Sequence, residues 1–201
     1  MNSPTALIKR WSSFLREELM QKIVFWACLF LSIFIKPAFS EVKTAFTPSE
    51  DCEKTIVDLI DQSTKNIDIA VYAINNKQIV KALIRANKRN VALRILTDRT
   101  QASNKRSKVK EMHEKGLNIR VHTKNKLMHN KFAIFDGQSL FIGSYNWTNA
   151  ASKQNSEGCT FLIKEPENIK VYQEHFEKLW HENTLPKSEK WFEKQKNGKK
   201  Q

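Results

Sequence analysis

Two neighbouring segments of the chain carry an imidazole, an ammonium group, a hydroxyl and an amide at fixed spacings. Residues 128–136 read Met-His-Asn-Lys-Phe-Ala-Ile-Phe-Asp, and residues 143–148 read Gly-Ser-Tyr-Asn-Trp-Thr. These groups suit a phosphodiester, which is an anion that resists nucleophilic attack. A catalyst has to place positive charge and hydrogen-bond donors around its oxygens, a nucleophile in line with the bond that breaks, and an acid beside the leaving oxygen.

Each of these side chains can fill one of those roles. Lys131 offers a compact positive charge, Asn146 offers directed N–H donors and Ser144 offers a hydroxyl. His129 is the natural nucleophile, because a neutral imidazole has a free nitrogen that can attack phosphorus. A carboxylate on the other ring nitrogen would fix the tautomer and stabilise the cation formed on attack. Glu157, at the head of the next predicted strand, is the candidate for that carboxylate.

A predicted hairpin positions the first of these groups. Residues 131–135 and 139–146 are predicted to be two strands joined through Asp136-Gly137, which is a strong turn signal. Asp136 has two interpretations: it shapes the turn and pairs with a nearby cation, or it touches substrate. Its place in the motif makes it a candidate catalytic residue.

The alternation of side chains along a strand predicts that the polar groups converge. His129 and Lys131 are two residues apart and share one face, as do Ser144 and Asn146. Two adjacent strands would then present an imidazole, an ammonium, a hydroxyl and an amide to one spot. The hairpin therefore predicts a phosphate site.

The spacing H-x-K-x4-D, followed by G-S-x-N, resembles that of the phospholipase D superfamily of phosphodiesterases. The resemblance covers nearly all of 41–183, with its specific content in 128–157. It implies a covalent phosphohistidine, a second histidine as general acid, and no metal or other cofactor. Members with two motif copies carry both histidines in one chain, whereas this chain has one copy. The resemblance therefore implies a homodimer with the active site on its two-fold axis.

Hydrophobic periodicity predicts an α/β fold. Apart from the hairpin, helices are expected at 48–62, 77–88 and 102–115 and from Pro166 onward, and strands at 66–74, 91–98, 117–122 and 157–163. Strands that alternate with helices and then cluster indicate a mixed β-sheet between helical layers. This is the α/β/α sandwich of the phospholipase D family, to which the motif points.

The first 40 residues are predicted to be a signal peptide. A basic flank precedes the apolar run 23–35, and small residues lie just before Glu41, where cleavage is expected. The run is 13 residues long, whereas a membrane-spanning helix needs about 20. The alternative is an uncleaved membrane anchor. In both cases the catalytic domain, 41–183, is exported to the periplasm or the medium, and the basic tail, 184–201, is predicted to be mostly disordered.

The charge of the exported part favours polyanionic partners. From Glu41 onward the chain has 29 basic and 19 acidic residues, a formal net charge of +10. This suits DNA, RNA or an anionic membrane. Basic residues cluster at 105–110 and 124–126, and they are either solvated surface or a rim that follows a phosphodiester backbone. Cys52 and Cys159 are expected either to form a disulfide or to be two buried thiols.

Three functions fit these observations. The first is an exported, metal-independent endonuclease that acts on DNA or RNA without sequence preference. The second is a phospholipase D that hydrolyses phosphatidylcholine-like lipids to phosphatidic acid. The approach to the motif, 123–128, is more basic than apolar, which favours the nuclease. The third is a binding protein with an inactive site, and the complete set of motif residues argues against it.

Overall fold

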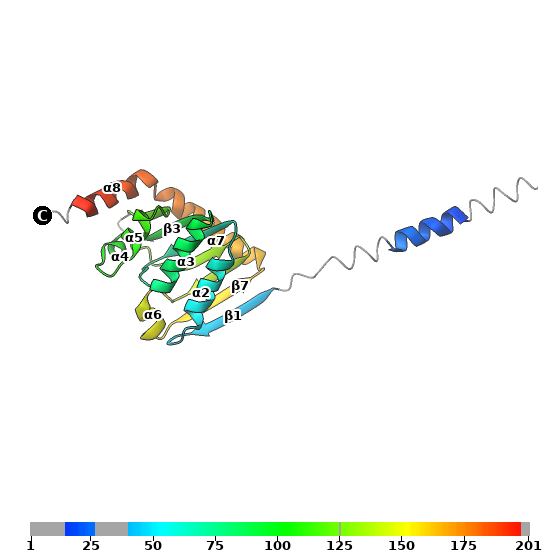
Figure 1. Cartoon of the computed structure of the whole chain (residues 1–201), viewed down its shortest axis with the longest axis horizontal. Coiled ribbons are helices and arrows are strands. Elements are labelled where there is room, and N and C mark those ends of the chain that lie inside the picture. The colour runs from blue at the N-terminus through cyan, green and yellow to red at the C-terminus, as the bar shows by residue number, and fades with distance from the viewer. Residues whose placement is uncertain (1–14, 27–39, 125, 198–201) are drawn as a thin grey trace, which may run out of the picture. The chain divides into compact units, whose positions relative to one another are not determined.

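The computed structural model describes residues 15–26, 40–124 and 126–197 (Figure 1). The chain divides into two units, Met1–Phe39 and Ser40–Gln201. In the first unit, residues 15–26 are helical and exposed. No helix within the described ranges is long and apolar enough to cross a bilayer. Most of the apolar run 23–35 lies outside them, so the signal peptide or anchor stays a prediction.

The second unit is built on a mixed sheet of seven strands in the order β1-β7-β6-β5-β2-β3-β4. Strands β2, β3 and β4 are parallel, β5 runs antiparallel to β2, and β6, β7 and β1 continue antiparallel. The bounds are β1 Glu41–Phe46, β2 Asn66–Val71, β3 Ala92–Asp98, β4 Ile119–His122, β5 Lys131–Phe135, β6 Ser139–Gly143 and β7 Gly158–Ile163. The sheet confirms the predicted α/β class.

Helices cover both faces of this sheet (Figure 1). Their bounds are α2 Asp51–Gln62, α3 Lys77–Lys88, α4 Arg99–Ser103, α5 Val109–Glu114, α6 Asn149–Lys153, α7 Pro166–Glu182 and α8 Leu185–Asn197. Strand alternation divides the core into two: Ile69 and Ala133 pack with α2 and α3, while Ala70 and Ile134 pack with α7. Both sides of the central strands are therefore buried, as a sandwich requires.

The helix predicted over 102–115 is wrong, because the segment forms two short helices with a loop between them. The Asp98 carboxylate accepts hydrogen bonds from the first backbone N–H groups of α4, which begins earlier than expected. Between the helices, the Asn104 side chain accepts from Arg106 N and the Ser107 hydroxyl accepts from Val109 N. Such local bonds compete with helical ones, so this sequence makes a turn where its periodicity predicts a helix.

The tail was also predicted wrongly, because α8 is an ordered helix against the second unit. Phe192 is buried, and its ring stacks on that of His113 with 3.7 Å between centroids. The buried Ser188 hydroxyl accepts from Val121 N on the edge strand β4. The helix thus covers an edge that would otherwise expose unpaired backbone groups. Residues 198–201 lie outside the described part of the chain.

A disulfide joins Cys52 on α2 to Cys159 on β7, across 107 residues of sequence. Of the two alternatives for these thiols, the structure has the disulfide. The bond ties the helical layer to the strand that begins beside Glu157. It therefore holds one wall of the candidate site to the core.

Candidate active site

Most of the predicted site residues meet at one end of the sheet, where β2 and β3 finish. Lys131, the first residue of β5, pairs with Val71 at the end of β2. Gly143, the last residue of β6, pairs with Cys159 near the start of β7. Antiparallel pairing therefore gathers segments that are distant in sequence. This end of the sheet holds His129, Lys131, Ser144, Asn146 and Glu157.

His129 is exposed, and Lys131 lies beneath it. The Lys131 ammonium donates to the His129 carbonyl at 2.9 Å and lies 5.1 Å from the centre of the Tyr72 ring. The same ring meets the His129 imidazole edge-on, with 4.6 Å between centroids. Only 9% of Lys131 is exposed, and burial lowers its pKa, although the nearby Glu157 carboxylate opposes this. A half-desolvated cation under an exposed imidazole can attract a phosphate oxygen strongly.

Tyr72 was missed by the sequence reasoning. It follows β2 directly, and its N–H donates to Asn130 O inside the motif, which keeps the ring against His129. Gln101 on α4 donates to the Tyr72 hydroxyl at 2.9 Å. The signal is the strand pairing that puts the end of β2 beside the motif, and this cannot be read from spacing alone. Tyr72 is therefore a positioning residue for the imidazole and the ammonium.

Asp98 is a second positioning residue that sequence reasoning missed. One carboxylate oxygen caps α4, and the other accepts from Met128 N at 3.3 Å. Asp98 itself is buried at the end of β3. It therefore fixes the backbone immediately before His129.

The loop after β6 carries the hydroxyl and the amide. β6 ends at Gly143 rather than at Asn146, because a Cβ at Gly143 would collide with the Gly158 carbonyl and its φ is +155°. Ser144 and Asn146 therefore leave the sheet instead of sharing a strand face. The buried Tyr145 and Trp147 hold this loop to the core.

The Asn146 side chain has hydrogen-bonding capacity to spare. Within the described residues its Oδ1 atom is buried and has no hydrogen-bond partner. Because buried polar atoms are nearly always satisfied, an unsatisfied amide beside an imidazole suggests a ligand contact.

Glu157 has a different partner from the predicted one. Ser144 Oγ donates to one of its carboxylate oxygens at 2.5 Å, and Asn155 donates to the other at 3.0 Å. Gly158 N donates to Ser144 Oγ in turn. No hydrogen bond in the described ranges joins Glu157 to His129. The carboxylate therefore orients the Ser144 hydroxyl, rather than the imidazole.

Asp136 lies outside this cluster, at the other end of β5, about 15 Å along the strand. Its carboxylate accepts from the backbone N–H groups of Thr64, Lys65 and Asn66. Partial burial opposes ionisation, but these hydrogen bonds outweigh it and lower the pKa of Asp136. With φ of +53°, Asp136 also opens the hairpin turn. Listing it as catalytic was wrong: its contacts are those of the structural interpretation.

The residues 41–197 were also searched for metal-binding clusters. The described part of the chain has no group of three or more His, Cys, Asp or Glu side chains that could hold a metal ion. The arrangement at the sheet end instead offers a nucleophile, a buried cation, a hydroxyl and an amide.

Residues 56–180, more than half of the chain, match the family described as cardiolipin synthase, PLD-like domain. The chain belongs to the phospholipase D superfamily. Its site is therefore that of a phosphodiesterase of this superfamily, with His129 and Lys131 as the histidine and lysine of the motif.

Relatives in the superfamily carry several names. The chain is 35% identical over 124 residues to a mitochondrial cardiolipin hydrolase of Chlamydomonas reinhardtii, which covers 62% of this chain and 55% of that protein. It is 34% identical over 137 residues to a phospholipase D of Rickettsia conorii, covering 68% of each. The chain thus spans about half to two thirds of these relatives.

Solved structures of the superfamily share the fold. Nuc from Salmonella typhimurium, described as a phospholipase D family member, has a TM-score of 0.69 at 24% identity, covering 73% of this chain and 97% of Nuc. NucT from Helicobacter pylori has a TM-score of 0.66 at 20% identity, covering 73% and 99%. Both likenesses support the phospholipase D-like sandwich that the sequence predicts.

Proposed function

We propose that this protein is a metal-independent endonuclease that cleaves DNA or RNA through a phosphohistidine on His129. One observation carries the proposal: an exposed imidazole stands directly over the buried Lys131 ammonium, beside an unsatisfied amide and an oriented hydroxyl. Lys131 and Asn146 bind the non-bridging oxygens of the scissile phosphate. The imidazole nitrogen is then free to attack phosphorus in line.

The reaction has two balanced steps. First, the imidazole nitrogen forms a bond to phosphorus while the bond from phosphorus to the leaving oxygen breaks, and an acid protonates that oxygen. Second, water attacks the phosphohistidine and loses its proton to the same group, now a base, so that free imidazole and a phosphomonoester result. Ser144, held by Glu157, donates a hydrogen bond to the phosphate during both steps.

The acid comes from a second copy of the chain in this proposal. Within the described residues, the remaining histidines have other settings. His113 pairs with Glu189, the buried His122 contacts Asn183, His181 pairs with Glu177 and His175 lies on α7. A homodimer that joins two such sheet ends would place one His129 as nucleophile and its symmetry mate as acid. The proposal therefore includes a symmetric dimer around one scissile phosphate.

The charge favours nucleic acid as the substrate. The chain from Glu41 onward has a formal net charge of +10, and Lys131 is the buried cation of the site. Electrostatic attraction of this kind steers polyanions toward a protein. Export of the domain, through the predicted signal at 1–40, is consistent with the Cys52–Cys159 disulfide, because such bonds persist in oxidising compartments.

The second candidate is a phospholipase D that acts at a membrane. Leu127, two residues before His129, is 60% exposed and would contact lipid tails. The names of the Chlamydomonas and Rickettsia relatives also favour it. We place it second because the sequence around Leu127 is mainly basic.

The deciding experiment gives the full-length protein plasmid DNA, RNA, and phosphatidylcholine or cardiolipin vesicles, each in excess EDTA. We expect nicked and linear DNA or shortened RNA, with little lipid product. His129→Asn should abolish cleavage, while His181→Asn, at a histidine on the exposed surface of α7, should retain it. Lipid hydrolysis without nucleic-acid cleavage would favour the second candidate. Activity that requires added magnesium would refute the metal-independent mechanism.

A further inference from the structure

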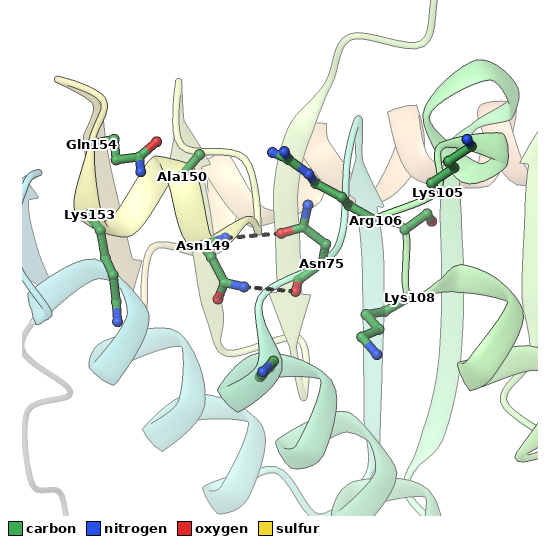
Figure 2. A pocket seen from close by; sticks show the side chains of 10 residues that line it. Asn75, Lys105, Arg106, Lys108, Asn149, Ala150, Lys153 and Gln154 are labelled. Atoms are coloured by element: carbon green, nitrogen blue, oxygen red, sulfur yellow. Dashed lines mark hydrogen bonds between the residues drawn. The ribbon is translucent and has the colours of Figure 1, made fainter.

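A basic pocket lies between α3, the α4–α5 loop and α6, and no role has yet been given to it. Its volume is about 440 Å³, within the usual range of ligand pockets. In Figure 2, Lys105, Arg106 and Lys108 come from the α4–α5 loop and Lys153 comes from α6, with Asn75 and Asn149 between them. No acidic residue lines the pocket. Its five cations are Lys77, Lys105, Arg106, Lys108 and Lys153.

Most of the positive charge around this basic pocket is not neutralised by the protein. Lys108 pairs with Glu111 at 2.7 Å. For the other four cations, no carboxylate of the described residues lies within 4.0 Å. Like charges that share one hollow repel one another, and this repulsion is relieved when an anion enters. The pocket is therefore suited to a phosphate.

The walls of the basic pocket are fixed by hydrogen bonds. Asn149 N donates to the Asn75 side chain at 3.0 Å, and the Asn149 amide donates back to Asn75 O, as Figure 2 shows. Asn75 N donates to Trp147 O, and Lys108 N donates to Ile74 O. The α4–α5 loop and the start of α6 are thus attached to the segment that follows β2. The pocket is preformed, which reduces the entropy lost on binding.

Two short segments connect the basic pocket to the active site. Asn75 lies three residues beyond Tyr72, whose ring contacts His129, and Asn149 lies three residues beyond Asn146. Three extended residues span about 10 Å. Pocket and site therefore lie at the same end of the sheet and within a few nucleotides of each other along a strand.

We propose that the basic pocket is a second phosphate subsite, which holds a backbone phosphate of the same nucleic-acid strand whose scissile phosphate lies at His129. The inference rests on the proposed nuclease function and names the residues that would give it preference for a polymer. A strand presents phosphates at regular intervals, so it can occupy both places at once. A phosphatidylcholine molecule has a single phosphate and can occupy only one.

The test compares substrates that reach the basic pocket with one that does not. The full-length protein and its Lys105→Gln/Arg106→Gln variant are given bis(p-nitrophenyl) phosphate, a dinucleotide and a twelve-nucleotide strand. For the wild type, kcat/KM should rise with strand length. For the variant, the ratio of kcat/KM on the long strand to that on the small diester should fall roughly tenfold. In a His129→Asn background, the salt dependence of strand binding should weaken by about one phosphate per lost contact.

A matched control removes two lysines from the exposed surface of α7. Lys170→Gln/Lys178→Gln makes the same change in net charge and should keep the wild-type ratio, which excludes an effect of overall charge. Equal ratios for the pocket variant and the wild type would overturn the subsite. So would a pocket variant that loses binding to anionic vesicles but keeps binding to the long strand. If the wild type cleaves neither the small diester nor the strands, the proposed function itself fails.

Discussion

The Asp136 carboxylate offers a sharp test of structural against catalytic roles within the motif. One oxygen accepts from Lys65 N and Asn66 N, and the other accepts from Thr64 N and its hydroxyl. In Asp136→Asn, one oxygen remains for the more buried pair, and the amide NH₂ faces the Thr64 donors. We expect a loss of about 2 kcal/mol in the free energy of unfolding, since water can solvate part of what is lost.

A second substitution extends the series. Asp136→Ala removes every acceptor and also places alanine at a φ of +53°, where its Cβ is disfavoured by about 1 kcal/mol or more. We expect a total loss of about 4 kcal/mol. Urea denaturation at neutral pH measures both values. Under conditions where the variants are folded, kcat on the small diester should stay within about twofold of the wild type, because Asp136 is far from His129.

The pH dependence checks the same reasoning. Hydrogen bonds lower the pKa of Asp136 in the folded protein below its unfolded value of about 3.9. The stabilisation is therefore present above about pH 4 and is lost as the pH falls through the folded pKa. The stability difference between wild type and Asp136→Asn should shrink over that range. A stable Asp136→Asn variant with a hundredfold lower kcat would refute the structural assignment.

Three further predictions follow from other contacts. Ser144→Ala should lower kcat about tenfold or more while KM changes little, measured on the small diester, because the hydroxyl held by Glu157 would be lost; an unchanged kcat would contradict its role. Cys52→Ala should reduce the free energy of unfolding by about 4–5 kcal/mol in urea, since the disulfide closes a long loop, and reduced wild type should match it. Phe192→Ala should release α8, so limited proteolysis should cut there first while the remaining domain resists; uniform resistance would show that the helix is not held by this ring.

The sequence predicted those elements whose formation depends on local signals. Residues 131–135 form β5 and 77–88 form α3 as expected, because alternation and periodicity in these segments agree with burial. The Asp136-Gly137 turn also formed, since both residues tolerate positive φ. The motif therefore gave the position of the nucleophile and of the lysine.

What could not be predicted depends on contacts between distant segments. Glu157 bonds to Ser144 because of the register between β6 and β7, which no spacing reveals. Tyr72 lies against His129 because β5 pairs with β2. The polar tail folds because its few apolar residues, such as Phe192, find a partner in α5. In each case tertiary packing overrides what the local sequence favours.

Direct detection of the covalent intermediate tests the central claim most directly. The full-length protein is mixed with labelled oligonucleotide, quenched in alkali, in which a phosphohistidine survives, and digested for mass spectrometry. We expect label on the peptide that contains His129, transient in the wild type and absent in His129→Asn. Rapid turnover by the wild type without label on His129, or label on another residue, would contradict the account.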